Sequence, residues 1–210
     1  MKKIKNKSSG QIYFLKGNNV ILDPIEDKDV PKIAGLIGKW TNDPVVTYYL
    51  FTGQRPKNKK QAAANLRRDL ESENNIIFLA VDKKTKKPIG YAGLYDINLI
   101  VRKAEFRILI GEKDFWGKGY GTEITELITF YGFDRIGLNR IYLGYTSAHD
   151  RADKTYKKVG YVYEGTRRED LYRNSTYYDS VIMAILRKDY YKNLYHLHVN
   201  KFFKKYESEK

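Results

Sequence analysis

The sequence predicts an α/β fold in which helices pack in layers against a β-sheet. Short apolar runs typical of strands alternate with segments of helical spacing along the chain. A glycine-rich turn joins one strand-like segment to a helix-like segment near the middle. The length of 210 residues and the 42% hydrophobic content suit one domain with a substantial core.

The first third of the chain predicts one strand followed by two helices. Residues 20–22 are all apolar, and the Asp-Pro pair after them ends the strand. Residues 26–40 have helical spacing, with Pro31 near the first turn, where its missing N–H is tolerated. A second and much more polar helix is expected over residues 60–72.

Three strands are expected next. Residues 76–81 and 89–95 are apolar runs joined by a polar, lysine-rich connection over residues 82–88, which predicts a hairpin. Residues 105–110 form a further run with a charged residue at its entry and apolar residues after it. We interpret this run as a buried strand.

The glycine-rich turn, Phe-Trp-Gly-Lys-Gly-Tyr-Gly-Thr, occupies residues 115–122 and precedes a helix expected over residues 119–135. Unpaired N–H groups at a helix N-terminus bind anions, and Lys118 adds a full charge. The spacing fits neither the dinucleotide-binding motif nor the P-loop. Taken alone, the glycines therefore predict either a phosphate site or an ordinary tight turn.

The last third predicts a strand over residues 139–145, a helix over residues 150–159 and a closing hairpin of strands 161–172 and 176–187. The hairpin turn is expected at residues 173–175. This part of the chain also carries the second motif.

Residues 149–165 read His-Asp-Arg-Ala-Asp-Lys-Thr-Tyr-Lys-Lys-Val-Gly-Tyr-Val-Tyr-Glu-Gly. This resembles the signature N-x-x-A-x-x-x-Y-x-K-x-G-F followed by E-G of the GNAT superfamily of acyl-CoA N-acyltransferases. His149 replaces the Asn and Tyr161 replaces the Phe. The glycine turn likewise resembles the superfamily's pyrophosphate loop, Q/R-x-x-G-x-G/A, with Trp116 in the first position. The matching residues of the second motif are Ala152, Tyr156, Lys158, Gly160, Glu164 and Gly165.

The resemblance covers residues 18–188 and implies a mixed, mostly antiparallel sheet of about seven strands flanked by helices. It is similar in detail to the ribosomal-protein N-acetyltransferase (RimJ/RimL-like) branch, through the Trp-Thr-Asn-Asp segment at 40–43 and the Tyr-Tyr-Asp segment at 177–179. We therefore expect a basic arm at 1–17, the acetyltransferase domain at 18–188 and a basic amphipathic extension at 189–210. The extension is expected to form a helix that packs on its own domain or on a second copy; a partner, RNA or a membrane surface is the alternative.

The resemblance implies direct transfer of an acetyl group from acetyl-CoA to a primary amine, with no covalent enzyme intermediate. Tyr156 takes the superfamily's tyrosine position and is expected to protonate the departing thiolate. Glu105 is the expected base, because burial at the edge of an apolar strand would favour a proton on its carboxylate. His149 could be the base, or could bind the cofactor in place of the usual Asn.

The cofactor is expected to lie along the strand end and the glycine turn, with Arg151 reaching the ribose phosphate. In the superfamily this strand end splays from its neighbour, and its backbone pairs with the pantetheine amides. The expected cofactor-binding residues are Leu109, Ile110, Gly111, Trp116, Gly117, Lys118, Gly119, Tyr120, Gly121, Thr122, His149, Arg151 and Tyr156. The acceptor is expected to be recognised by loops 41–60 and 96–104 and by the closing hairpin.

Composition limits the remaining alternatives. The chain has no cysteine and only three histidines, so no metal site is expected. No apolar run approaches membrane-spanning length, and no apolar segment follows the basic N-terminus, so we expect a cytoplasmic protein without membrane insertion.

The net charge of +14 has two readings. It could attract RNA, the ribosome or an anionic ligand, or it could be a solvated lysine-rich surface. It makes a polycationic acceptor a poor match unless a local acidic pocket overrides it. A homodimer and a non-catalytic RNA- or ribosome-binding module with the same fold remain open alternatives.

Overall fold

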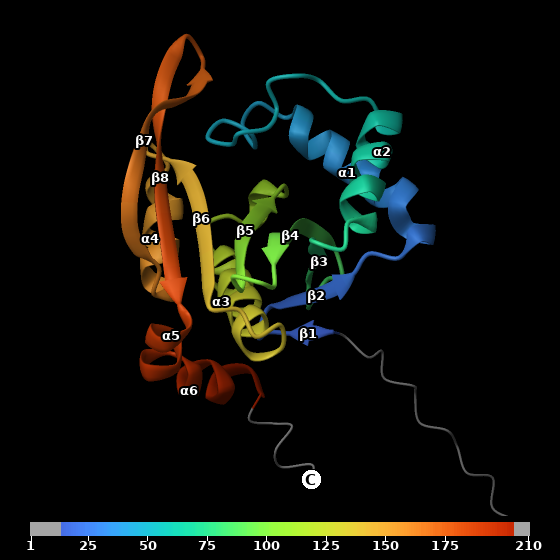
Figure 1. The fold of residues 1–210 in the computed structure, drawn as a ribbon. Helices are drawn as coiled ribbons and strands as arrows, with labels where there is room; N and C mark the ends of the chain where they lie inside the picture. The colour runs from blue at the N-terminus through green and yellow to red at the C-terminus, as the bar shows by residue number, and fades with distance from the viewer. Residues whose placement is uncertain (1–13, 204–210) are drawn as a thin grey trace, which may run out of the picture.

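The computed structural model describes residues 14–203. These residues form one eight-stranded sheet in the order β1-β2-β3-β4-β5-β6-β8-β7 (Figure 1). Only the β5–β6 pair is parallel, and every other neighbouring pair is antiparallel. This confirms the mixed, mostly antiparallel sheet. The strands are β1 Leu15–Lys16, β2 Val20–Pro24, β3 Ile76–Asp82, β4 Pro88–Asn98, β5 Lys103–Ile110, β6 Arg140–Thr146, β7 Val162–Arg173 and β8 Thr176–Leu186.

The prediction of about seven strands missed β1, which pairs with β2 at the edge of the sheet. Leu15 is buried, and the Phe14 ring stacks on the Phe78 ring with their centroids 5.3 Å apart. The sheet therefore includes residues that precede residue 18, where the acetyltransferase domain was expected to start. A two-residue strand has no periodicity of its own, so only its pairing reveals it. The rest of the expected basic arm, residues 1–13, lies outside the described residues.

The helices lie on both faces of the sheet. On one face α1 packs against α2, and the apolar side chains of α1, including Trp40, form a small core with Leu109 of β5. On the other face α3 carries the main core and packs against α4; its residues from Glu123 to Phe133 are all buried. The helical segments up to this point are η1 Asp27–Asp29, α1 Val30–Asn42, α2 Lys59–Glu71, η2 Lys113–Phe115, α3 Tyr120–Asp134 and α4 Asp150–Val159.

The predicted helix over residues 26–40 is divided. It opens with the 3₁₀ turn η1, and α1 follows with Pro31 in its first turn, where a proline is tolerated. The closing hairpin has a two-residue turn in which Asn174 and Ser175 both have positive φ. Such a turn matches the right-handed twist of its two strands.

The C-terminal extension is three short segments rather than the single helix expected: α5 Arg187–Asn193, α6 Tyr195–His198 and the π-helical turn η3 Val199–Phe203. Tyr190 is fully buried against Phe133, and its hydroxyl hydrogen-bonds Nδ1 of His198 at 2.9 Å. Lys201 pairs with Glu126 of α3. As far as residue 203, the extension therefore packs on its own domain. Within the described residues, no helix has the length and apolar character needed to cross a membrane.

Candidate active site

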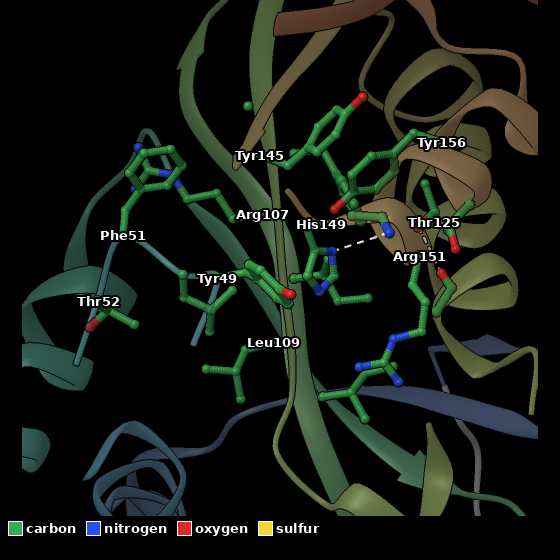
Figure 2. Close-up of a pocket in the computed structure, with 18 of the residues that line it drawn as sticks. Tyr49, Phe51, Thr52, Arg107, Leu109, Thr125, Tyr145, His149, Arg151 and Tyr156 are labelled. Carbon is green, nitrogen blue, oxygen red and sulfur yellow. Dashed lines mark hydrogen bonds between the residues drawn. The ribbon is translucent and has the colours of Figure 1, made fainter. Parts of the chain in front are cut away.

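The site forms where the two parallel strands separate. β5 and β6 pair only between residues 103–105 and residues 140–142, although β5 continues to Ile110 and β6 to Thr146. Past these pairs the strands diverge, and a cleft with a volume of about 1660 Å³ opens between them (Figure 2). Pockets for one small ligand usually measure ~300–1,000 Å³. The cleft therefore has room for two ligands.

The diverging edge of β5 offers backbone hydrogen-bonding groups to the cleft. Gly111 N–H donates to Ile89 O of β4 at 2.9 Å, and the groups of an antiparallel strand alternate between its two sides. Ile108 and Ile110 must then turn their backbone groups away from β4. Ile110 O does so, because it accepts the Trp116 indole N–H at 2.8 Å.

The same alternation decides which backbone groups at the strand end are free for the expected pantetheine contacts. Gly111 N–H is used by β4, and the alternation turns Leu109 N–H to the same side. Leu109 lines the cleft, and its side chain packs with the α1 core. A Cβ at Gly111 would overlap the Trp40 ring, so this glycine serves the close approach of α1.

The glycine turn ends in an open helix N-terminus. Gly117 and Gly119 have φ of +71° and +85°, and Gly119 is the N-cap residue of α3. No side chain caps this helix, so the N–H groups of its first turn lack partners within it. A Cβ at Gly117 or Gly119 would meet no atom within 4 Å, so the turn has an open face. Gly117, Gly119, Gly121 and Thr122 line the cleft, which makes this end of it a fitting cradle for phosphates.

Two residues of the turn do not line the cleft. The side chains of Lys118 and Tyr120 face a second cavity of about 580 Å³, and Tyr120 OH donates to Asp82 at 2.5 Å. The charge of Lys118 therefore lies beside the second cavity and not among the residues that line the cleft. Trp116 does line the cleft, and the Arg151 guanidinium lies 4.9 Å from the centre of its ring.

His149 caps the other helix that reaches the cleft. Its Nδ1 accepts the Ala152 N–H at 3.1 Å, which is the bond that an N-cap side chain makes. Its ring packs edge-on against Tyr49, with their centroids 4.8 Å apart. Burial, and secondarily the charge of Arg151, lowers the pKa of His149 to about 4, so its imidazole is neutral near pH 7.

Tyr156 is held within an aromatic cluster on the α3–α4 face. Its ring centre lies 5.5 Å from that of Tyr145 and 6.3 Å from that of Phe106. Only 8% of the residue is exposed, and burial raises the pKa of its phenol well above the usual range. The phenol therefore keeps its proton, while the residue lines the cleft (Figure 2).

The surroundings of Glu105 differ from the expectation of an apolar strand edge. Its carboxylate accepts a hydrogen bond from the Arg107 guanidinium at 2.6 Å, and its side chain is 25% exposed. Glu105 lines the cleft, so it is well placed for the acceptor. The ion pair was not foreseen, although residues two apart on a strand share a face.

The loop between α1 and α2 forms part of the cleft wall over residues 44–46 and 48–52. It is tied to the sheet, because Thr146 donates to Tyr49 O at 2.6 Å and Arg173 donates to Thr52 O at 2.7 Å. Hairpin residues, including Asp170 and Ser180, line the cleft as well, in agreement with the acceptor loops expected at 41–60 and in the hairpin. No residue of the third expected loop, 96–104, lines it.

Comparison with known proteins agrees with this geometry. The family model described as acetyltransferase (GNAT) domain matches residues 19–162. The chain is 32% identical to spermidine N(1)-acetyltransferase of Escherichia coli, over 82% of this chain and 89% of that protein. It is 26% identical to a putative ribosomal N-acetyltransferase of Bacillus subtilis, over 79% of this chain and 90% of the relative.

Among solved structures, spermidine N-acetyltransferase from Vibrio cholerae, in complex with CoA and spermine, superposes with a TM-score of 0.73. The two are 27% identical, and the match covers 83% of this chain and 99% of that one. The chain belongs to the GNAT acetyltransferase family. It is an acetyl-CoA-dependent N-acetyltransferase that acts on an amine. The RimJ/RimL-like branch stays a prediction.

Proposed function

We propose that this enzyme transfers the acetyl group directly to the acceptor amine, with Tyr156 donating a proton to the CoA sulfur as the thioester bond breaks. One observation carries the proposal: the divergence of β5 and β6 opens a single cleft that the uncapped N-terminus of α3 and the neutral phenol of Tyr156 both line. Burial raises the pKa of the Tyr156 phenol and so keeps it protonated, which leaves a proton available on the side of the cleft that the sulfur would reach.

Different residues of the cleft would bind different parts of the cofactor. The first-turn N–H groups of α3 would hold the pyrophosphate, and Arg151 would add charge near it. The outward backbone groups of Ile108 and Ile110 would pair with the pantetheine amides, and one of these N–H groups would face the carbonyl oxygen of the acetyl group. Acetyl-CoA supplies the acetyl group and the thiolate leaving group.

Glu105 is the base in this proposal. It lines the cleft on the face of β5 that carries α1 and α2, where the acceptor would enter. His149 is the less suitable candidate, because its Nδ1 already accepts the Ala152 N–H. His149 instead positions the helix that carries Tyr156.

The proposal is tested by replacing Tyr156 with Phe, which keeps the ring packing and removes the donor. We expect kcat for CoA-thiol release to fall roughly 10²-fold, with an almost unchanged Tm and acetyl-CoA affinity. Tyr145→Phe is the matched control, because Tyr145 belongs to the same aromatic cluster but spends its hydroxyl on Asp153 at 2.6 Å. Equal losses in the two variants would contradict the role of Tyr156.

The role of Glu105 is tested by a separate variant. Glu105→Gln should lower kcat and remove the basic limb of the pH–rate profile. An unchanged profile in that variant would transfer the role of base to His149 or to a water relay.

The acceptor and further partners belong to this proposal too. The similar proteins include enzymes named for spermidine and for the ribosome, so similarity alone does not select one amine. The charge of +14 supports contact with RNA or the ribosome, and a homodimer is compatible with the fold; both stay predictions.

A further inference from the structure

Arg107 lies on the acceptor side of the sheet. The side chains of β5 alternate, so Phe106, Ile108 and Ile110 pack into the core beneath α3, whereas Leu109 packs with α1. Arg107 shares the face of Leu109 and lines the cleft. In Figure 2 it lies with Leu109 on one side of the strand, while Tyr156 and Arg151 lie on the other.

The groups around Arg107 make a site for a cation. The Glu105 carboxylate accepts from its guanidinium at 2.6 Å, and the Asp96 carboxylate accepts at 2.9 Å. The guanidinium carbon lies 4.7 Å from the centre of the Tyr95 ring. Two carboxylates and an aromatic face are groups that also recognise an alkylammonium ion.

The Arg107 guanidinium stays protonated in this site. Burial opposes the charged form of Arg107, but the hydrogen bond to Glu105 and the charges of Glu105 and Asp96 outweigh it and raise the arginine's pKa. The side chain is 48% exposed, so a ligand in the cleft meets a positive charge there. The site is therefore filled by the enzyme's own cation.

We propose that Arg107 is a specificity determinant, which occupies the cation subsite of the acceptor cleft and so selects amines with a single positive charge over linear polyamines. This inference rests on the proposed function, because it places the acceptor on the α1–α2 face. A second ammonium group along the acceptor would meet the guanidinium at the carboxylates that could otherwise bind it. An occupied subsite of this kind discriminates by repulsion rather than by added contacts.

The proposal also explains how this enzyme could differ in its acceptor from the enzymes of the same fold that are named for spermidine. The acid groups near the cleft, Glu105 and Asp96, are both paired with Arg107, which offsets one of their two negative charges and occupies the space between them. A third carboxylate, Asp69 of α2, lines the same cleft, and burial raises its pKa. Removing the charge of Arg107 would leave a local acidic pocket of the kind that a polyamine needs.

The test compares spermidine with n-butylamine, which reproduces its aminobutyl arm without a second charge. Binding to the enzyme–CoA complex is measured by calorimetry, and acetylation by CoA-thiol release. In the wild type we expect butylamine to exceed spermidine at least 10-fold in affinity and in kcat/KM. Arg107→Gln should reverse most of this ratio by strengthening spermidine, whereas Arg107→Lys, which keeps the charge, should preserve it.

Spermidine binding is a gain of function in Arg107→Gln, so damage to the fold cannot imitate it, and acetyl-CoA affinity serves as the folding control. If Arg107→Gln does not fold, the wild-type ratio alone decides. Spermidine that binds the wild type as tightly as butylamine, or an unchanged ratio in a folded Arg107→Gln, overturns the role of Arg107. An enzyme that binds acetyl-CoA but acetylates no primary amine contradicts the proposed function instead.

Discussion

Two helices direct their N-termini into the same cleft, and they differ in capping. The N-terminus of α3 follows Gly119, has no side-chain cap and faces open space. The N-terminus of α4 is closed by His149, whose Nδ1 accepts the Ala152 N–H. Unpaired N–H groups beside a cleft can be satisfied by an anionic ligand and capped ones cannot, so the first helix end suits binding and the second suits positioning.

The two helix N-termini therefore have different roles in the cleft. The glycines of the first turn leave a surface without side chains, which the phosphates would approach in the proposed function. The cap of the second helix fixes the start of α4, and thereby the direction of Tyr156 two turns later. Charge does not follow this division, since Arg151 of the capped helix α4 lines the cleft and Lys118 of the open glycine turn does not.

The largest effect should come from closing the open helix end. Gly119→Val places a β-branched residue at a φ of +85°, which costs about 1–3 kcal/mol and displaces the turn. We expect acetyl-CoA affinity, measured by calorimetry, to fall about 10- to 100-fold. Gly137→Val is the matched control, since Gly137 has a φ of +72° and open space around it but does not line the cleft. Equal acetyl-CoA affinities for the two variants would remove the phosphate site from this turn.

The second prediction tests the closed helix end by pH. The pKa of His149 is about 4 in the folded state and about 6.5 when the chain is unfolded, so between these values only the unfolded state takes up the proton. Stability should therefore fall as pH decreases from 7 to 5, by on the order of 1–2 kcal/mol for this group. Burial also lowers the pKa of His198 to about 4, so that residue contributes in the same window.

His149→Asn keeps a capping side chain and removes the titrating ring, so it should flatten the fall in the free energy of unfolding by about half. His149→Ala should flatten it too, but should also lose about 1 kcal/mol at pH 7 because the cap is gone. Urea unfolding at pH 7, 6 and 5 measures both effects. Identical pH dependences in the wild type and His149→Asn would contradict the assignment of a neutral, capping His149.

The smallest effect concerns the two charges beside the cleft. Arg151→Ala should weaken acetyl-CoA binding about 3- to 10-fold, because this guanidinium lines the cleft beside Trp116. Lys118→Ala should change it by no more than about 2-fold, because that ammonium group faces the second cavity and is screened by solvent. If calorimetric titration shows a larger loss of acetyl-CoA affinity in Lys118→Ala than in Arg151→Ala, the cofactor extends from the turn towards the second cavity instead.

Local patterns account for most of what could be predicted. The glycine turn between a strand and a helix, and the order of the other strands and helices, were predicted correctly because each depends on residues close together in sequence. The short strand β1, the broken C-terminal extension and the first turn of α1 were not, since backbone pairing and packing decide them. The extension had the aromatic spacing of one helix, yet Tyr190 and His198 pack around a break at Leu194.

The sequence by itself determined that this chain carries a glycine-rich turn before a helix, a further helix that contains Tyr156, and the fold that places them in order. The tertiary structure decided which groups are available for chemistry. Residues 103–105 of β5 pair with β6, whereas residues 108–110 do not. Gly111 donates its N–H to β4 and lies against the Trp40 ring. The Glu105 carboxylate pairs with Arg107. Each of these outcomes depends on a partner from another element, or on the angle at which two strands separate. Residue type sets what a group can do, but only packing sets which of its atoms remain free to do it.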